Sequence, residues 1–131
     1  MPLQFDVTTR NNMLAQIVND AASGYLLIYS GAAPANVAAS LAGTTLLAAL
    51  PLSATMGTVS AGVLTFNAIT QENAVVSGTA SFFRISNTAQ SAYYVQGTVG
   101  TAGCDINLNT TTITSGGPVA VSSLTFTAPG A

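Results

Sequence analysis

Histidine and tryptophan are absent from the 131-residue chain, and cysteine occurs once, as Cys104. Without histidine, neither a Ser-His-Asp nor a Cys-His catalytic arrangement can form, and no imidazole is present to bind a metal. A single cysteine cannot make a disulfide within the chain, and the role of a small buried apolar residue suits it better than that of a reactive thiol. The sequence therefore predicts a protein that is not an enzyme, with no catalytic residue, no metal site and no cofactor.

Charged side chains are also scarce: two are basic and four are acidic, 5% of the chain, where soluble domains average about 25%. The four carboxylates, Asp6, Asp20, Glu72 and Asp105, are isolated from one another in the sequence, so the paired acids of a glycosidase are not indicated. A net charge of −2 offers no basic surface for nucleic acid or an anionic membrane. We expect a surface of Ser, Thr, Asn, Gln, Ala and Gly, which repels neighbouring subunits weakly and suits a protein that works inside an assembly.

Long apolar runs are missing as well, although 49% of the residues are hydrophobic. The longest candidate, residues 44–52 (TTLLAALPL), is far shorter than the roughly 20 residues of a membrane-spanning helix, and it contains Pro51. The opening residues, MPLQFDVTTRNN, lack the basic and apolar regions of a signal peptide. These features predict a soluble chain without an export signal, and its length predicts one domain over residues 1–131.

One helix is predicted, near residues 9–22. Its apolar face is formed by five residues at helical spacing, Met13, Leu14, Ile17, Val18 and Ala21. Thr8 or Thr9 is expected to cap its first turn, and Gly24 to end it in a left-handed conformation.

The chain after Gly24 is predicted to be β structure. Residues 25–30 (YLLIYS) suit a strand buried on both faces, and residues 44–52 are assigned to a strand on their length and Pro51. Further strands are expected in residues 62–70, 73–87, 92–100, 104–109 and 118–128. The last segment changes phase, which predicts a bulge at Ser122–Ser123 that lets its apolar residues face one core. A total of about seven or eight strands after one amino-terminal helix predicts a mainly β fold, an antiparallel β-sandwich or jelly roll.

Arg84 is conspicuous because it lies in an apolar strand, FFRIS, and the chain has only one other basic residue, Arg10. The two-residue period of a strand places Phe82 and Arg84 on one face, and Phe83 on the other. Because both faces carry a phenylalanine, both are expected to be covered. The cover over Arg84 is the helix, a loop or another subunit.

Three roles for Arg84 follow from this position. Catalysis is the weakest, because no companion groups exist. A structural ion pair with Glu72 or Asp105 is the second, since burying an unpaired guanidinium costs several kcal/mol. The third is an interface anchor, since an arginine beside an aromatic residue is typical of binding hot spots.

Several stretches spread over nearly the whole chain resemble a family of small virion proteins of tailed bacteriophages: LQFDVTTRNNML, LLIYSGAAPAN, GTASFFRIS, and VQGTV with VAVSSLTFTAP. The resemblance implies a structural role, and capsid decoration (cement) proteins of this size often have jelly-roll-like folds. It further implies a place on the capsid surface of a virion assembled in the host cytoplasm. The partners would be the major capsid protein and further copies of the chain, in a dimer or trimer, without nucleic acid or membrane. No functional residue of the family can be matched to this chain individually.

Residues 1–7 are either an arm that reaches a neighbouring subunit or a first strand. The interface candidates are Leu3, Phe5, Arg10, Phe82 and Arg84. Two alternatives remain open, a tail, baseplate or fibre-associated subunit, and a carbohydrate- or receptor-binding module. In the module, four tyrosines would provide stacking platforms, Tyr25, Tyr29, Tyr93 and Tyr94.

Overall fold

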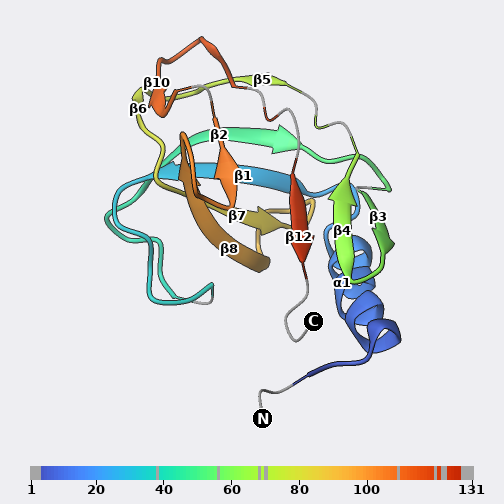
Figure 1. Ribbon diagram of the computed structural model, residues 1–131. Helices are drawn as coiled ribbons and strands as arrows, with labels where there is room; N and C mark the ends of the chain where they lie inside the picture. The colour runs from blue at the N-terminus through green and yellow to red at the C-terminus, as the bar shows by residue number, and fades with distance from the viewer. Residues whose placement is uncertain are drawn as a thin grey trace.

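The computed structural model describes residues 4–37, 39–55, 57–67, 69, 71–108, 110–119, 121 and 124–127. Within these residues, one amino-terminal helix precedes a mainly β fold with antiparallel sheets, as the sequence predicts (Figure 1). The helix is α1, Val7–Asp20. The strands are β1 Tyr25–Ser30, β2 Thr45–Pro51, β3 Gly57–Ser60, β4 Val63–Phe66, β5 Glu72–Asn73, β6 Gly78–Thr79, β7 Phe82–Ser86, β8 Tyr93–Gly100, β9 Ile106–Asn107, β10 Thr112–Ile113, β11 Pro118–Val119 and β12 Thr125–Thr127. No helix in the described residues has the length and apolar character needed to cross a membrane.

Helix α1 begins and ends two residues earlier than predicted, because its cap is a different residue. The Asp6 carboxylate accepts hydrogen bonds from the backbone N–H groups of Thr8 and Thr9, at 3.0 and 3.3 Å. Thr8 and Thr9 were expected to provide the capping side chain, and instead they supply the N–H groups that Asp6 satisfies. An aspartate and a threonine are both favoured caps, so local sequence left the choice open.

Gly24 does not end the helix in a left-handed conformation, which corrects the second expectation for α1. The C-cap is Ala21, and Ser23 takes the positive φ of 57°. The reason for glycine at position 24 is close packing: a Cβ there would collide with the carbonyl oxygen of Ser86. The start of β1 is therefore able to lie against the end of β7.

The largest sheet has five strands in the order β2-β1-β7-β8-β9. Its first three pairings are antiparallel, and the last, between β8 and β9, is parallel. Residues 87–92 join β7 to β8, and the two strands pair antiparallel. β7 is the middle strand of this order, and both of its faces are covered. It is therefore buried along its whole length. The central position of β7 is what places Arg84 inside the protein.

A three-stranded sheet, β12-β4-β3, lies beside the first sheet, and α1 packs against β3 and β4 (Figure 1). Phe126 of β12 makes two aromatic contacts, one to the five-stranded sheet and one within its own sheet. Its ring stacks on Phe83 of β7 with 6.1 Å between centroids and meets Phe66 of β4 edge-on at 5.1 Å. The remaining strands form two short antiparallel pairs, β10 with β6 and β11 with β5.

The main core occupies the face of the five-stranded sheet that carries Phe83 and Ile85. It also takes in the apolar residues of the carboxy-terminal segment that were expected to face one core: Val119, Val121 and Leu124 are buried, and Phe126 packs against them. The predicted bulge at Ser122–Ser123 lies outside the described residues.

A second, smaller core lies on the opposite face of the same sheet. Leu27, Tyr29 and Phe82 are buried there, and the Tyr29 and Phe82 rings stack at 5.0 Å. Residues 31–37 and 39–44, which connect β1 to β2, cover this face; we call them the covering loop. Leu41 of the covering loop packs into the small core. Arg84 shares this face with Phe82, as the two-residue period of the strand predicts.

Candidate functional site

Arg84 occupies the middle of β7, opposite Leu27 of β1 and Gln96 of β8. Its side chain is 1% exposed, and it is the largest fully buried side chain in the described residues. A strand at the edge of the sheet would have left such a side chain in water, where an arginine carries no desolvation cost. The register of the sheet therefore creates a buried cation that needs compensation from its surroundings.

Neutral oxygen atoms provide that compensation. The Nε atom of Arg84 donates to Oε1 of Gln96 at 2.9 Å. The Nη2 atom donates to the backbone oxygens of Asn36 and Ala39, at 3.2 and 2.9 Å. Gln96 in turn donates from Nε2 to the backbone oxygen of Pro34 at 2.8 Å. Two side chains of the sheet thus hold three carbonyl groups of the covering loop, and we call this arrangement the Arg84 clamp.

Two tyrosines complete the surroundings of the guanidinium. The Arg84 Cζ atom lies 5.0 Å from the centroid of the Tyr93 ring, a cation–π contact. Burial, together with the neighbouring Tyr93, raises the pKa of Tyr29 to about 12, although the positive charge of Arg84 opposes the rise. Tyr29 therefore stays a neutral phenol near pH 7 and does not supply a counter-charge. The cluster carries one positive charge among dipoles and an aromatic ring.

The expected ion pair between Arg84 and Glu72 or Asp105 is wrong. Asp105 binds Thr98 instead, accepting from its backbone N–H at 3.0 Å and its hydroxyl at 3.3 Å. Its carboxylate lies against Gly97, on the Phe83 side of the sheet, whereas Arg84 points to the other side. Glu72 is exposed in β5, which pairs with β11. The tertiary structure keeps both carboxylates away and gives the guanidinium neutral acceptors.

The interface candidates fall into two groups. Phe82 and Arg84 lie on the same face of the sheet and are buried by their own chain. The covering loop covers Arg84 there, and of the three covers considered, the helix, a loop or another subunit, it is a loop. Phe5 and Arg10 are half-buried at the start of α1, where Nε of Arg10 donates to the Phe5 carbonyl at 3.1 Å. Leu3 lies outside the described residues, as do residues 1–3 of the segment 1–7 that was expected to be an arm or a first strand. Residues 4–6 form no strand, and Val7 already belongs to α1.

The tyrosines that were considered as sugar-stacking platforms contribute to packing. Tyr29 is buried, and Tyr25 and Tyr93 pack against the small core. Tyr94 packs against the main core. A flat, open aromatic face is what a stacking platform needs, and these rings are engaged with other side chains.

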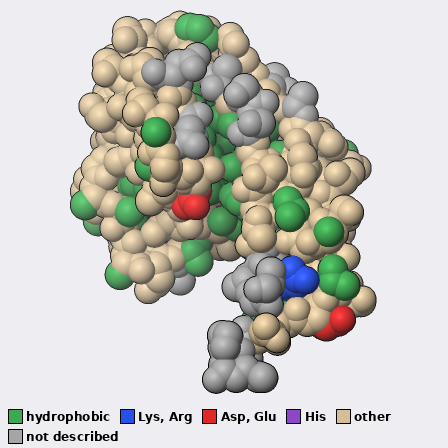
Figure 2. Space-filling view, in the orientation of Figure 1, with side chains coloured by type: hydrophobic (Ala, Val, Ile, Leu, Met, Phe, Trp, Pro, Cys, Tyr) green, Lys and Arg blue, Asp and Glu red, His purple; other side chains and the backbone are tan. Residues whose placement is uncertain are grey.

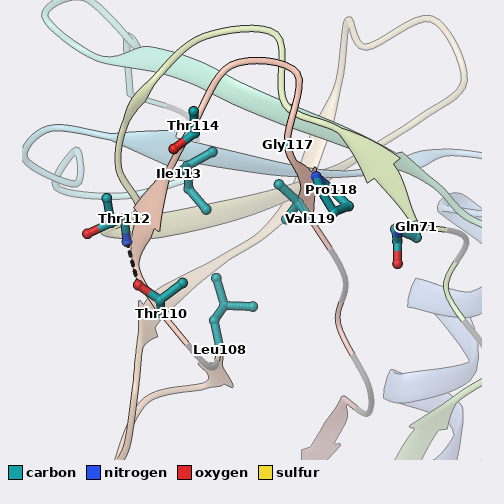
Figure 3. A pocket seen from close by; sticks show the side chains of 9 residues that line it. All are labelled: Gln71, Leu108, Thr110, Thr112, Ile113, Thr114, Gly117, Pro118 and Val119. Carbon is teal, nitrogen blue, oxygen red and sulfur yellow. Dashed lines mark hydrogen bonds between the residues drawn. The ribbon is translucent and has the colours of Figure 1, made fainter.

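A pocket of about 330 Å³ lies between β10 and β11 and was missed by the sequence analysis. Figure 3 shows Leu108, Ile113 and Val119 in its middle, with hydroxyl and carboxamide groups around them. Its lining residues are Gln71, Leu108, Thr110, Thr112, Ile113, Thr114, Gly117, Pro118 and Val119. Four threonines lie within NTTTITSGG, three of them in a row, and this pattern is equally typical of a polar turn.

In the described part of the chain, no group of three or more His, Cys, Asp or Glu side chains is placed to hold a metal ion. Cys104 is half-buried at the turn that leads into β9. Its sulfur lies so close to Gly100 that a Cβ added at that glycine would collide with it. Among the described residues, the two candidate sites considered are the Arg84 clamp, which is internal, and the pocket between β10 and β11.

Comparison with protein-family models, with curated proteins and with solved structures finds no match to this chain.

Proposed function

We propose that the chain is a non-enzymatic structural protein of a tailed-phage virion, which binds the capsid shell and stabilises it as a decoration (cement) protein. The observation that carries the proposal is the near absence of positive charge from the surface. The chain has two basic side chains, and the burial of Arg84 leaves Arg10 as the only one with solvent exposure. With one half-buried arginine and four exposed carboxylates as its charged side chains, such a surface repels a neighbouring subunit weakly and has few charges to desolvate when it is covered.

Figure 2 supports this description for one face of the molecule, on which charged side chains appear at only a few places. Hydrophobic side chains gather there in a hollow between β8 and β12. Exposed apolar side chains occur elsewhere too: Val7 and Met13 on α1, and Val75 and Val76 between β5 and β6. Apolar contacts surrounded by uncharged polar groups are typical of stable protein–protein interfaces.

A stiff body is the second requirement for a protein that holds neighbouring capsomers together. The stacking of Phe126 on Phe83 joins the three-stranded sheet to the five-stranded sheet, and this contact supports the sandwich-like body that the proposal requires. The Arg84 clamp holds the covering loop onto the outer face of the five-stranded sheet. A subunit with these restraints loses little conformational entropy on binding, which favours affinity.

Binding to assembled shells tests the proposal directly. The purified chain is mixed with shells assembled from the major capsid protein of the same phage, and the bound fraction is measured by co-sedimentation. Saturable binding and a higher shell melting temperature are expected, because a ligand that binds only the assembled state stabilises it. Shells already saturated with the unlabelled chain provide the control. Absence of saturable binding would contradict a decoration role.

A tail, baseplate or fibre-associated subunit is the alternative that the same weakly charged surface and mainly β fold support. Gold-labelled antibody on intact virions separates the two locations. Label over the shell agrees with decoration, and label confined to the tail transfers the structural role there.

A further inference from the structure

The pocket between β10 and β11 has an apolar floor and an uncharged polar rim. Leu108, Ile113 and Val119 form the floor, and they are 8%, 8% and 3% exposed. Threonine hydroxyls and the Gln71 carboxamide lie around them (Figure 3). No ionisable side chain lines the pocket. A charged ligand group would lose its hydration there without gaining a partner, so the pocket selects a neutral ligand.

The lining also excludes one class of neutral ligand. Sugar-binding sites use aromatic rings to stack on the apolar face of the sugar, and no aromatic residue lines this pocket. The volume of about 330 Å³ lies at the small end of the range of ligand sites. An aliphatic side chain flanked by its own peptide groups fits the apolar floor and the polar rim together. The side chain would contact the floor, and the peptide groups would contact the rim.

The backbone beside the pocket is protected against the addition of another strand. The N–H of Thr112 is already bonded to the hydroxyl of Thr110 at 3.1 Å. Pro118 in β11 has no N–H to offer. An incoming segment therefore finds no backbone donor at these two positions, and its recognition has to come from a side chain placed in the pocket.

Exposed apolar residues adjoin the pocket. Ser115 follows Thr114 of the rim, and its hydroxyl donates to the backbone oxygen of Val75 at 3.4 Å. Its N–H donates to Oγ of Ser77 at 2.8 Å. Val75 is 65% exposed, the highest value among the large hydrophobic residues of the described chain. A pocket beside exposed apolar residues has the layout of an interface hot spot, in which one anchor is buried and its surroundings exclude water.

We propose that this pocket receives one aliphatic side chain from a neutral peptide segment of the shell protein. The inference rests on the proposed function for the identity of the partner. It adds which surface of the chain makes the contact and which residue class the partner presents. The pocket is then the anchor point, and Val75 beside it is part of the surrounding contact.

The first test uses N-acetyl-leucinamide as the probe, with the intact chain labelled with ¹⁵N for NMR. Backbone amides around residues 108–119 are expected to shift on titration, with a dissociation constant in the millimolar range, as suits a ligand of this size. N-acetyl-serinamide and N-acetyl-aspartic acid amide are the matched probes, and they are expected to cause much smaller shifts. Shifts of equal size with all three probes, or no shifts at these residues, would overturn the inference.

Variants of Thr114 make the test specific to the pocket. Thr114→Glu places a carboxylate on the rim and is expected to weaken binding of N-acetyl-leucinamide roughly tenfold, because that charge must be desolvated. Thr114→Gln has a similar size without the charge, and Thr58→Glu adds the same charge on an exposed residue of β3. Thr58→Glu is expected to bind as the unmodified chain does, and Thr114→Gln is expected to bind the probe several-fold more tightly than Thr114→Glu, because no charge has to be desolvated. Melting temperatures of all three establish that each is folded.

The same variants distinguish this inference from the proposed function. If the unmodified chain binds shells and Thr114→Glu binds them equally well, the pocket is not the contact and the function stands. If Thr114→Glu alone loses shell binding while Thr114→Gln and Thr58→Glu keep it, both ideas are supported. A chain that binds the leucine probe but no shell overturns the proposed function, and with it the partner named here.

Discussion

Removing the Arg84 clamp is expected to loosen the covering loop and to lower the stability of the whole chain. Arg84→Ala deletes three hydrogen bonds between a charged donor and the oxygens of Gln96, Asn36 and Ala39. At about 1.5 kcal/mol each, their gross contribution is roughly 4–5 kcal/mol. Removing a buried cation returns part of this, on the order of 2 kcal/mol, because its desolvation cost disappears. We therefore expect a net loss of about 2–3 kcal/mol in the free energy of unfolding.

Urea unfolding measures this loss, and thermal melting is expected to fall by roughly 10 °C, at about 4 °C for each kcal/mol. Hydrogen exchange shows which part of the chain is loosened. The backbone amides of the covering loop should exchange faster, while the exchange rates of the β4 amides should stay nearly the same. Arg84→Lys keeps the charge but lacks the planar fork that reaches Gln96 and the loop together, so it is expected to lose a comparable amount.

Two results would refute the reasoning. Arg84→Ala with unchanged stability and unchanged exchange in the covering loop would mean that the clamp holds nothing. Loss of shell binding with an unchanged melting temperature would instead return Arg84 to the role of an interface anchor. A double variant with Gln96→Ala supplies the coupling energy, expected between about 0.5 and 3 kcal/mol for residues in one network.

Three further predictions concern single positions. Asp6→Ala removes the cap of α1 and should lower the free energy of unfolding in urea by about 1 kcal/mol; an unchanged value would mean that the cap seen here does not stabilise the helix. Gly24→Ala places a Cβ against the carbonyl oxygen of Ser86, so circular dichroism should report a large drop in melting temperature, and a melting temperature equal to that of the unmodified chain contradicts this close approach. The pKa of Tyr29 is raised to about 12, above the ordinary value near 10, so the neutral phenol is favoured in the folded state; its contribution to stability is complete below about pH 10 and is lost as the pH rises towards 12. Ultraviolet titration of the unmodified chain and of a Tyr29→Phe variant checks this: the difference between the two curves should show one tyrosine that ionises near pH 12, and ionisation of that tyrosine near pH 10 would refute it.

The elements of the fold were predictable where periodicity carries the information. The two-residue alternation in FFRIS correctly places Phe82 and Arg84 on one face, and the helical spacing around Leu14 correctly predicts α1. Boundaries were less predictable, because Asp6, Thr8 and Thr9 are all good caps and the choice among them depends on the packing of the helix. The long predicted strand of residues 73–87 is divided into β5, β6 and β7, which pair with different partners.

The pocket could not be predicted from the sequence, for a related reason. Its walls, β10 and β11, are held apart because each pairs with a different strand, β6 or β5. Gln71, far from both in the chain, closes one side (Figure 3). Threonines in a row indicate only a polar segment until these pairings are known.

By itself, the sequence determined that the chain is mainly β with one amino-terminal helix and that Arg84 shares a face with an aromatic residue. Those properties depend on local spacing and on which side of each element is apolar. Only the tertiary structure decided what covers Arg84. Its acceptors on Asn36 and Ala39 lie 48 and 45 positions away in the chain, and they are backbone carbonyls, which every residue possesses. The path of the covering loop therefore selects them, and no side-chain pattern reveals that path in advance.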